Sequence, residues 1–298
     1  MMKRFFAIAI LVSLFPSPKT LLASEPTLRV LVTDGNKNVV EELPLEDYLA
    51  GVVKHEMSPT WPAESLKAQT IAARTYALTM KERNRTAKTG RTYDVTSTMF
   101  DQVYQKTSQG KSTVTTAVAA TRGLILKRDG RTFLTYYHSC CGGETEYAAN
   151  VWPGSVPTRI AMDPYCARSP KLTWEYRLPT KQFMATLNAQ GTHVQNIASL
   201  ATTTLPHSRR VDMLLIDDGE GMKMVRATDL RRIFGYANLK STWFNVGLER
   251  NEVVFAGRGY GHGVGLCQWG AKGMAEAGKM YQDILKFYYP DAEIASAY

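Results

Sequence analysis

Two apolar helical patterns, separated by prolines, constrain the fold of this 298-residue chain more than any other feature. Residues 45–57 place Leu, Val and Met at helical spacing, which predicts a buried helix. Pro59 and Pro62 end that helix and begin a second one that continues to about Arg85. Glu56, near the end of the first helix, is therefore expected to lie beside a turn.

Glu56 is the first candidate for chemistry because its neighbours in the sequence are apolar: Val52, Val53, Met57 and Trp61. Poor solvation disfavours the charged form of a carboxyl group and raises its pKa, which a general acid needs near neutral pH. The alternative interpretation is that Glu56 ends a helix and faces water, as most glutamates do.

The other patterns predict short strands and further helices. Strand pairs are expected at 28–32 with 39–40, 124–127 with 132–137, 211–216 with 222–225, and 243–248 with 253–256. Helices are expected at 111–122, 180–187, 229–234, 272–277 and 281–288. The predicted fold class is α+β, with helices packed with short antiparallel strands and hairpins in one compact domain.

The amino-terminal residues predict export. Lys3 and Arg4 precede the apolar run 5–15, and Ala23 fits a cleavage position, so residues 1–23 are interpreted as a signal peptide and 24–298 as the mature domain. An uncleaved anchor is the alternative. Nothing later approaches 18 uninterrupted apolar residues, so no membrane span is expected after cleavage. The expected location is the periplasm or cell envelope.

The formal charge of +9 suits an anionic polymer such as those of a bacterial envelope. Nucleic acid is not expected as a partner, because the chain carries an export signal and has no block rich in Lys and Arg.

Glycine alternates at positions 257, 259, 261, 263 and 265, which lets a ligand or another backbone approach closely. This segment predicts either a tight internal turn or the floor of a sugar groove, and it lacks the Gly-Lys-Ser/Thr ending of a phosphate loop. His138 and His262 stand in loop-like sequence, where each is a candidate to bind substrate or to orient Glu56.

Two enzyme classes are excluded by their motifs. His55-Glu56 lacks the second histidine of a metalloprotease helix, because position 59 is proline. The Gly-x-Ser-x-Gly motif of α/β-hydrolases is absent as well.

The four cysteines leave three alternatives open. In an oxidising compartment Cys140 or Cys141 is expected to form a disulfide with Cys166. A zinc site made from His138, Cys141 and Cys166 is the second alternative, because thiolate and imidazole suit that metal. Free thiols are the third.

Four blocks in order give the chain a family resemblance. They are HEMSPTWPAESLKAQTIAARTYAL at 55–78, the run 95–104 with the helix after it, YHSCCGG at 137–143 and RGYGHGVGLCQWGA at 258–271. Together they resemble the stage II sporulation protein D family (SpoIID/LytB), whose members are glycan-strand lytic transglycosylases or amidase enhancers. The likeness extends from about residue 28 to residue 290.

The resemblance implies an exported lytic transglycosylase that cleaves peptidoglycan between N-acetylmuramic acid and N-acetylglucosamine and leaves 1,6-anhydro ends. Ordinary glycosidases need two carboxylates. A lytic transglycosylase needs only one, here Glu56, because the muramic 6-hydroxyl serves as nucleophile. The implied substrate-binding residues match the family blocks or lie beside them: Arg74, Tyr76, His138, Ser139, Tyr260, His262 and Gln268.

The resemblance also implies partners and alternatives. Strands already stripped of stem peptides are the expected substrate, so an amidase is expected to act first. No cofactor is required for this chemistry, and a structural zinc is an option because a metal occurs in some relatives. The alternative functions are a non-catalytic, glycan-binding enhancer of an N-acetylmuramoyl-L-alanine amidase, and a zinc-dependent hydrolase built on His138, Cys141 and Cys166.

Overall fold

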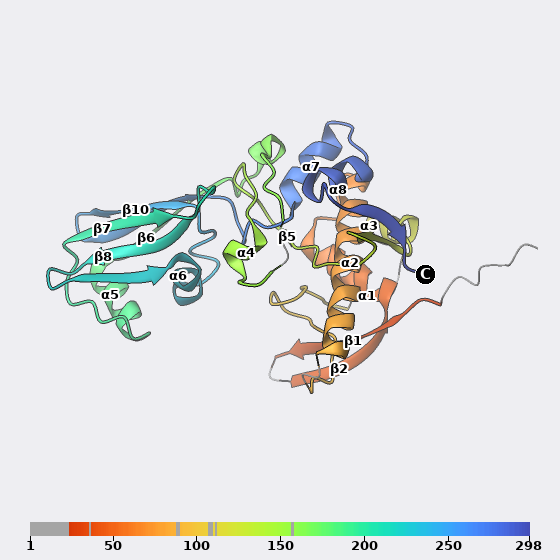
Figure 1. Cartoon of the computed structure of the whole chain (residues 1–298), viewed down its shortest axis with the longest axis horizontal. Helices are drawn as coiled ribbons and strands as arrows, with labels where there is room; N and C mark the ends of the chain where they lie inside the picture. Colours follow the sequence, from red (N-terminus) through yellow and green to blue (C-terminus); the bar gives the residue numbers. More distant parts are fainter. Residues whose placement is uncertain (1–23, 36, 88–89, 107–109, 111, 156–157) are drawn as a thin grey trace, which may run out of the picture.

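A computed structural model describes residues 24–298, except for 36, 88–89, 107–109, 111 and 156–157. The predicted signal peptide, 1–23, lies outside the described residues. Helices and small sheets alternate along the chain, which confirms the α+β fold class (Figure 1). The buried hydrophobic residues form two clusters, one centred on helices and one between small sheets.

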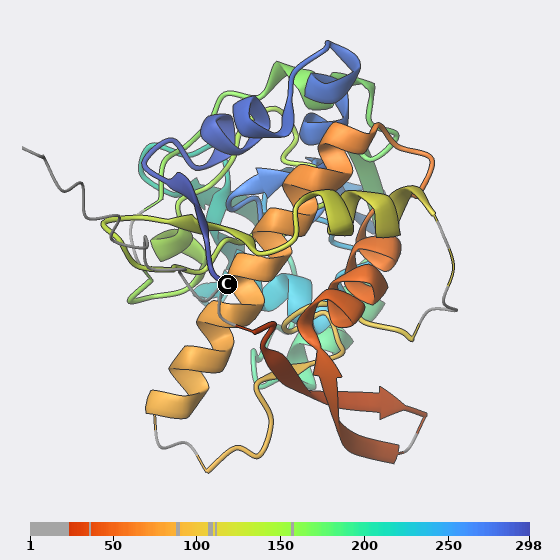
Figure 2. The same cartoon turned by 90° about the vertical axis from the view of Figure 1, so that its right-hand side faces the viewer.

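Five helices build the first cluster. They are α1 (Leu45–Glu56), α2 (Ala63–Thr86), α3 (Thr113–Ala120), α7 (Gln268–Glu276) and α8 (Tyr281–Tyr288). The long α2 passes through the middle, with α1 and α3 near it and the C-terminal helices packed on its N-terminal half (Figure 2). We call these helices and the short sheets around them the helical lobe.

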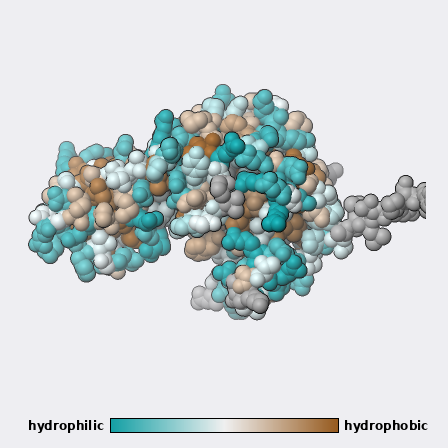
Figure 3. Space-filling view, viewed as in Figure 1, coloured by the Kyte–Doolittle hydropathy of each residue, from teal (hydrophilic) through white to brown (hydrophobic). Residues whose placement is uncertain are grey.

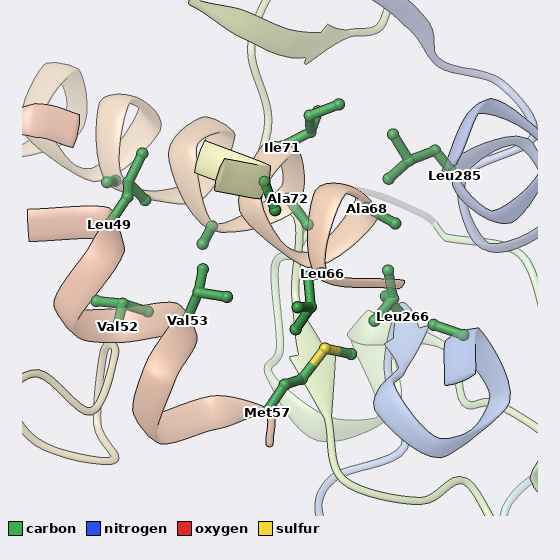
Figure 4. Packing of buried hydrophobic residues seen from close by; sticks show 14 of the residues in the cluster. Leu49, Val52, Val53, Met57, Leu66, Ala68, Ile71, Ala72, Leu266 and Leu285 are labelled. Atoms are coloured by element: carbon green, nitrogen blue, oxygen red, sulfur yellow. The ribbon is translucent and has the colours of Figure 1, made fainter. Parts of the chain in front are cut away.

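The turn between α1 and α2 contains Pro59 and Pro62, as predicted. Met57 follows α1 in an extended conformation, which ends the helix. Pro62 directly precedes α2, and its ring fixes φ at a value compatible with a helix start. Apolar side chains from the end of α1 and the start of α2 meet Leu266 and Leu285 from the C-terminal segment (Figure 4). This packing fixes the end of α1, and with it the backbone of Glu56.

The edge of the helical lobe carries the predicted strand pair. β1 (Thr27–Asp34) pairs antiparallel with β2 (Lys37–Pro44), and β3 (Val95–Thr96) adds to β1 in parallel. Leu28 and Val30 of β1 are fully buried against the helices, whereas Val39 and Val40 of β2 are exposed.

The predicted hairpin from 124 to 137 is wrong beyond its turn. β4 (Leu124–Lys127) pairs with β13 (Glu293–Ser296), and only an isolated bridge joins Arg128 to Arg131. β5 (Tyr137–His138) pairs in parallel with β12 (Leu266–Cys267). Both pairings join segments more than 120 residues apart, so a local strand-turn-strand pattern gave the right turn and the wrong partners. The parallel pair places the His138 and Cys267 backbones side by side.

The second cluster lies in a group of elements that we call the sheet lobe. One sheet has the order β10-β11-β6 and the other β7-β8-β9. The strands are β6 (Thr173–Pro179), β7 (Ser199–Thr204), β8 (Val211–Asp217), β9 (Met222–Arg226), β10 (Phe244–Glu249) and β11 (Glu252–Arg258), with helices α5 (Thr180–Asn188) and α6 (Ala227–Phe234). Phe183 of α5 stacks on Phe234 of α6, and Phe255 of β11 packs against Phe183 at a tilt of 45°.

Short helices and one buried arginine connect the lobes. α4 (Ala148–Val151) and the 3-10 helix η1 (Pro164–Arg168) belong to the linking segment, which lies between the lobes in Figure 1. Arg210 directly precedes β8. Its guanidinium donates to the Cys141 carbonyl at 2.9 Å and lies 3.8 Å from the Glu146 carboxylate. Because Arg210 is almost fully buried, these contacts fix one lobe against the other.

The surface is mainly hydrophilic, with apolar residues scattered in small patches on the face of Figure 3. Of the helices in the described part of the chain, none combines the length and the apolar character that crossing a bilayer requires.

Candidate functional site

A pocket of about 460 Å³ opens beside the C-terminal end of α1. Seven of the eight residues predicted to form the catalytic and substrate-binding site line it: Glu56, Tyr76, His138, Ser139, Tyr260, His262 and Gln268. They come from α1, α2, the end of β5 with the residue after it, the glycine-rich segment and the first residue of α7. The structure therefore brings together residues more than 200 positions apart in the sequence.

Glu56 is held at the wall of this pocket by the first residue of α7. The Gln268 amide donates a hydrogen bond from Nε2 to Glu56 Oε2 at 2.9 Å. Burial raises the pKa of the Glu56 carboxyl above its ordinary value. Hydrogen bonds from Gln268 and from the Val103 backbone lower that pKa, but burial is the larger effect. The carboxyl is thus both oriented and biased toward its protonated form.

Arg74 lies outside the pocket, which corrects the expectation that it contacts substrate. Its guanidinium is fully buried and forms two hydrogen bonds with the Glu46 carboxylate, at 2.8 and 2.7 Å. A third hydrogen bond joins it to the Leu124 carbonyl at 2.9 Å. Because α2 turns this side chain away from Glu56, Arg74 ties α2 to the start of α1 and to β4.

The two histidines line the same pocket, with ring centroids 5.5 Å apart. His138 Nδ1 donates to the Val264 carbonyl at 3.1 Å, while Nε2 has no hydrogen-bond partner among the described residues. Burial lowers the pKa of His138 to about 3 and that of His262 well below its ordinary value. Both rings are therefore neutral near pH 7, and His138 Nε2 is an acceptor.

Asp101 is a carboxylate in the pocket that sequence reasoning missed. Its Oδ2 accepts hydrogen bonds from the Thr96 backbone N–H and hydroxyl, at 2.8 and 2.9 Å. Its Oδ1 accepts from the Tyr76 hydroxyl at 3.2 Å. Both oxygens are occupied, so Asp101 orders the loop after β3 and orients Tyr76.

Aromatic side chains that line the same pocket were also missed. Trp152 stacks on Tyr136 with centroids 4.2 Å apart and an interplanar angle of 15°, and its ring lies 4.8 Å from that of His262. Phe100 is 78% exposed at the rim. Their sequence signal is weak, because isolated aromatic residues in loops resemble ordinary core residues.

Lys171 supplies positive charge near the acid. Its ammonium group donates to the Ser139 hydroxyl at 3.3 Å and lies 4.9 Å from the centre of the Tyr260 ring. The charge of Lys171 acts on Glu56 and lowers the pKa of its carboxyl slightly. Lys171 immediately precedes the sheet lobe, outside the blocks that suggested the site.

The glycine-rich segment serves mainly as internal packing. A Cβ on Gly265, whose φ is +71°, would lie 2.0 Å from the Tyr136 carbonyl oxygen. A Cβ on Gly261, whose φ is +116°, would lie 2.8 Å from the His138 side chain. The segment can therefore run against residues 136–142, and only Gly261 and its neighbours reach the pocket.

The cysteines gather behind the pocket without His138, which corrects the predicted metal set. Ligand atoms of Cys141, Asp163, Cys166 and Cys267 lie within 4.8 Å of one another. The Cys141 and Cys166 sulfurs are 3.5 Å apart as free thiols, so of the three predicted alternatives the disulfide is not formed in this structure. Each of these four residues is at most 1% exposed. A catalytic zinc keeps an open coordination position, so this closed cluster gives no support to a zinc-dependent hydrolase.

Two family models match different parts of the chain. The family model described as "Stage II sporulation protein" matches residues 33–127, and one described as a domain of unknown function matches residues 168–265. The second match covers most of the sheet lobe.

Three relatives extend this likeness to most of the chain. A Brachyspira hyodysenteriae protein described as uncharacterized is 37% identical over 86% of this chain and 68% of its own length. The "Amidase enhancer" of Bacillus subtilis is 34% identical over 83% of this chain, which spans only 40% of that relative. The "Stage II sporulation protein D" of Bacillus amyloliquefaciens is 30% identical over 92% of this chain and 82% of its own length. With this coverage added to the shared blocks, the chain belongs to the stage II sporulation protein D family.

Proposed function

We propose that this protein is a peptidoglycan lytic transglycosylase with Glu56 as its acid and base. The observation that carries the proposal is a single oriented carboxyl group, with a raised pKa, in a pocket large enough for sugar rings. The bond cleaved is the one between N-acetylmuramic acid and N-acetylglucosamine.

In the first half of the reaction, protonated Glu56 gives its proton to the glycosidic oxygen as the bond from C1 of muramic acid breaks. In the second half, the Glu56 carboxylate takes the proton of the muramic 6-hydroxyl while O6 bonds to C1. The product is a 1,6-anhydro ring, no water is consumed, and the acid ends protonated for the next turnover. One carboxyl group therefore suffices.

The hydrogen bonds of Asp101 support this one-carboxylate chemistry. A hydrolytic glycosidase needs a second carboxylate that is free to activate water or attack the sugar. Asp101 has both oxygens engaged by Thr96 and Tyr76. Its carboxylate is therefore a poor base, because losing any of these donors would cost hydrogen-bond energy.

The remaining pocket residues suit a glycan. The faces of Tyr136, Trp152 and Phe100 offer apolar surfaces for sugar rings. Lys171 and Arg83 are exposed cations at or near the pocket that can meet the lactyl carboxylate of muramic acid. That carboxylate is free when the stem peptide has been removed, so an amidase acting first would create the group these cations bind.

The location proposed with this function is the cell envelope, where peptidoglycan lies. The relatives' names, "Stage II sporulation protein D" and "Amidase enhancer", support a cell-wall role. The second candidate function is a glycan-binding enhancer of an N-acetylmuramoyl-L-alanine amidase, favoured by the name of the Bacillus subtilis relative. In that function Glu56 would hydrogen-bond to sugar without transferring a proton.

The test uses the purified chain, Glu56→Gln and the control Glu82→Gln, which changes an exposed glutamate of α2. Each is incubated with amidase-stripped peptidoglycan, and 1,6-anhydro ends are counted by mass spectrometry. Anhydro ends from the unaltered chain and from Glu82→Gln, but not from Glu56→Gln, are the expected result. Intact glycan in all three, with amidase turnover raised equally by all three, would replace the enzyme with the enhancer.

A further inference from the structure

We propose that Cys141, Cys166, Cys267 and Asp163 bind one structural zinc ion behind the pocket. The site is assigned from this cluster alone and does not depend on the proposed glycan cleavage. Its ligands come from three segments: the loop after β5, η1 with the residue before it, and the end of β12.

The donor atoms have the separation of a four-coordinate site. Around a tetrahedral zinc with Zn–S bonds of about 2.3 Å, sulfurs lie about 3.8 Å apart. Here the Cys141 and Cys166 sulfurs are 3.5 Å apart, and Cys141 Sγ is 3.1 Å from Asp163 Oδ2. All four donor atoms fall within 4.8 Å of one another, so small side-chain movements would place one cation at contact distance from each.

The buried carboxylate supplies a second and independent observation. Asp163 is 1% exposed, and no Lys, Arg or His forms an ion pair with it among the described residues. Its hydrogen-bond donors are the Tyr288 hydroxyl at 2.9 Å, the Tyr165 backbone N–H and the Cys141 thiol. A carboxylate removed from water without a cation is costly, and a metal ion in contact with Oδ2 supplies the missing charge.

Backbone N–H groups point at the sulfurs as they do in metal–thiolate sites. Cys267 Sγ accepts from the N–H groups of Gly270 and Cys141, at 3.3 and 3.2 Å. Cys141 Sγ accepts from the Gly143 N–H at 3.4 Å. Such donors stabilise negative sulfur and orient it toward the metal. Gly270 must also lack a side chain, because its Cβ would lie 2.2 Å from Asp163 Oδ2.

The rival for this cluster is a disulfide between Cys141 and Cys166. It would require the two sulfurs to close from 3.5 Å to about 2.05 Å. It would also leave Asp163 and Cys267 without a charged partner beside them. Zinc uses all four groups at once, which is why the structure favours the metal.

A zinc ion here would fix part of the pocket. Cys267 directly precedes Gln268, whose amide holds Glu56. Ser139, which also lines the pocket, lies two residues before Cys141. The metal would therefore join the loop after β5 to the residue that precedes α7. Its four protein ligands would leave no open coordination position.

The first experiment measures metal and thiols in the full-length chain purified without chelator. We expect one zinc per chain by plasma mass spectrometry and four reactive thiols after unfolding. Chain that loses metal during purification is reduced and titrated with Zn²⁺, and we expect it to bind one equivalent. No bound zinc with two fewer thiols would establish the disulfide, and a reduced chain that binds no added Zn²⁺ would also overturn the proposal.

Variants assign the ligands. Cys267→Ser and Asp163→Asn are expected to lower zinc affinity by at least tenfold, and the neighbouring Cys140→Ser to leave it unchanged. If Cys140→Ser lost zinc affinity and Asp163→Asn kept it, the fourth ligand would be the Cys140 thiolate and not Asp163. If these variants fail to fold, Co²⁺ added to the unaltered chain gives the answer. Strong visible bands of tetrahedral cobalt with sulfur-to-metal charge transfer are expected, and weak octahedral bands would contradict the site.

Discussion

The Gln268 side-chain amide donates to the Glu56 carboxylate at 2.9 Å, and this contact joins the end of α1 to the start of α7. It stabilises the charged form of Glu56 and opposes the rise in pKa that burial causes. The balance between these two effects sets the pH range in which Glu56 holds a proton.

Replacing Gln268 should therefore move the pH profile of the reaction. Without the hydrogen bond the carboxylate is less stable, so the pKa of Glu56 rises further in Gln268→Leu. Under the proposed mechanism, activity falls at high pH as Glu56 loses its proton, so the alkaline limb of kcat/KM should shift to higher pH. The measurement is kcat/KM on stripped glycan strands across pH. An alkaline limb that stays in place, or moves to lower pH, would exclude Glu56 as the group that sets it.

The charged form of the buried Glu56 carboxyl should also destabilise the folded protein. A carboxyl whose folded pKa is raised contributes its stabilising effect below the unfolded pKa and loses it as pH rises through the folded value. At neutral pH, Glu56→Gln should therefore raise the free energy of unfolding by about 1 kcal/mol. Below pH 4 the gain should vanish, because both states are then protonated. Urea unfolding at the two pH values checks this, and an equal gain at both would mean that charge is not the cause.

Arg74 and Glu46 should behave as a structural pair. Arg74→Met leaves the Glu46 carboxylate buried without its cation, which should cost about 3–5 kcal/mol in unfolding free energy. Arg74→Met with Glu46→Leu should recover most of that loss. Urea unfolding of the single and double variants measures this coupling. A folded double variant whose KM for glycan is unchanged fits the structural role, while a large rise in KM would return Arg74 to substrate binding.

Gly265 and Gly278 separate close packing from backbone strain. Both have positive φ, +71° and +79°, but only at Gly265 would a Cβ meet another atom, the Tyr136 carbonyl oxygen at 2.0 Å. Gly278→Ala should cost about 1 kcal/mol from strain alone. Gly265→Ala should cost several times more, because the Tyr136 backbone must move. Thermal unfolding compares the two, and equal losses would show that β12 can shift away from β5 without penalty.

Trp152 should contribute to glycan affinity through its flat, stacked ring. Trp152→Ala removes a surface held in place by Tyr136, and we expect about a fivefold to tenfold weaker Kd for stripped strands, equivalent to about 1 kcal/mol. Met280→Ala, an exposed apolar change outside the residues that line the pocket, is the control. The affinities are measured by calorimetric titration, and all variants carry Glu56→Gln so that no glycan is cleaved. An effect in the control as large as that of Trp152→Ala would point to nonspecific apolar binding.

Local patterns in the sequence predicted the helices well. Residues 45–57 and 62–85 became α1 and α2 within a residue or two, because apolar spacing and proline act over one or two turns. The shared blocks then indicated seven residues that the fold places around one pocket. Their roles in binding stay predictions.

Only the tertiary structure decided which groups face one another. Arg74 lies on α2 near Glu56 in the sequence, yet the direction of its side chain pairs it with Glu46. His138 stands three residues before Cys141, but the parallel pairing of β5 with β12 leaves its ring at the pocket while Cys267 joins the buried cysteines. Helix spacing and turns are set by neighbouring residues, so the sequence alone reveals them. Ligand sets and ion pairs depend on contacts between distant segments, which become fixed only when the whole core packs.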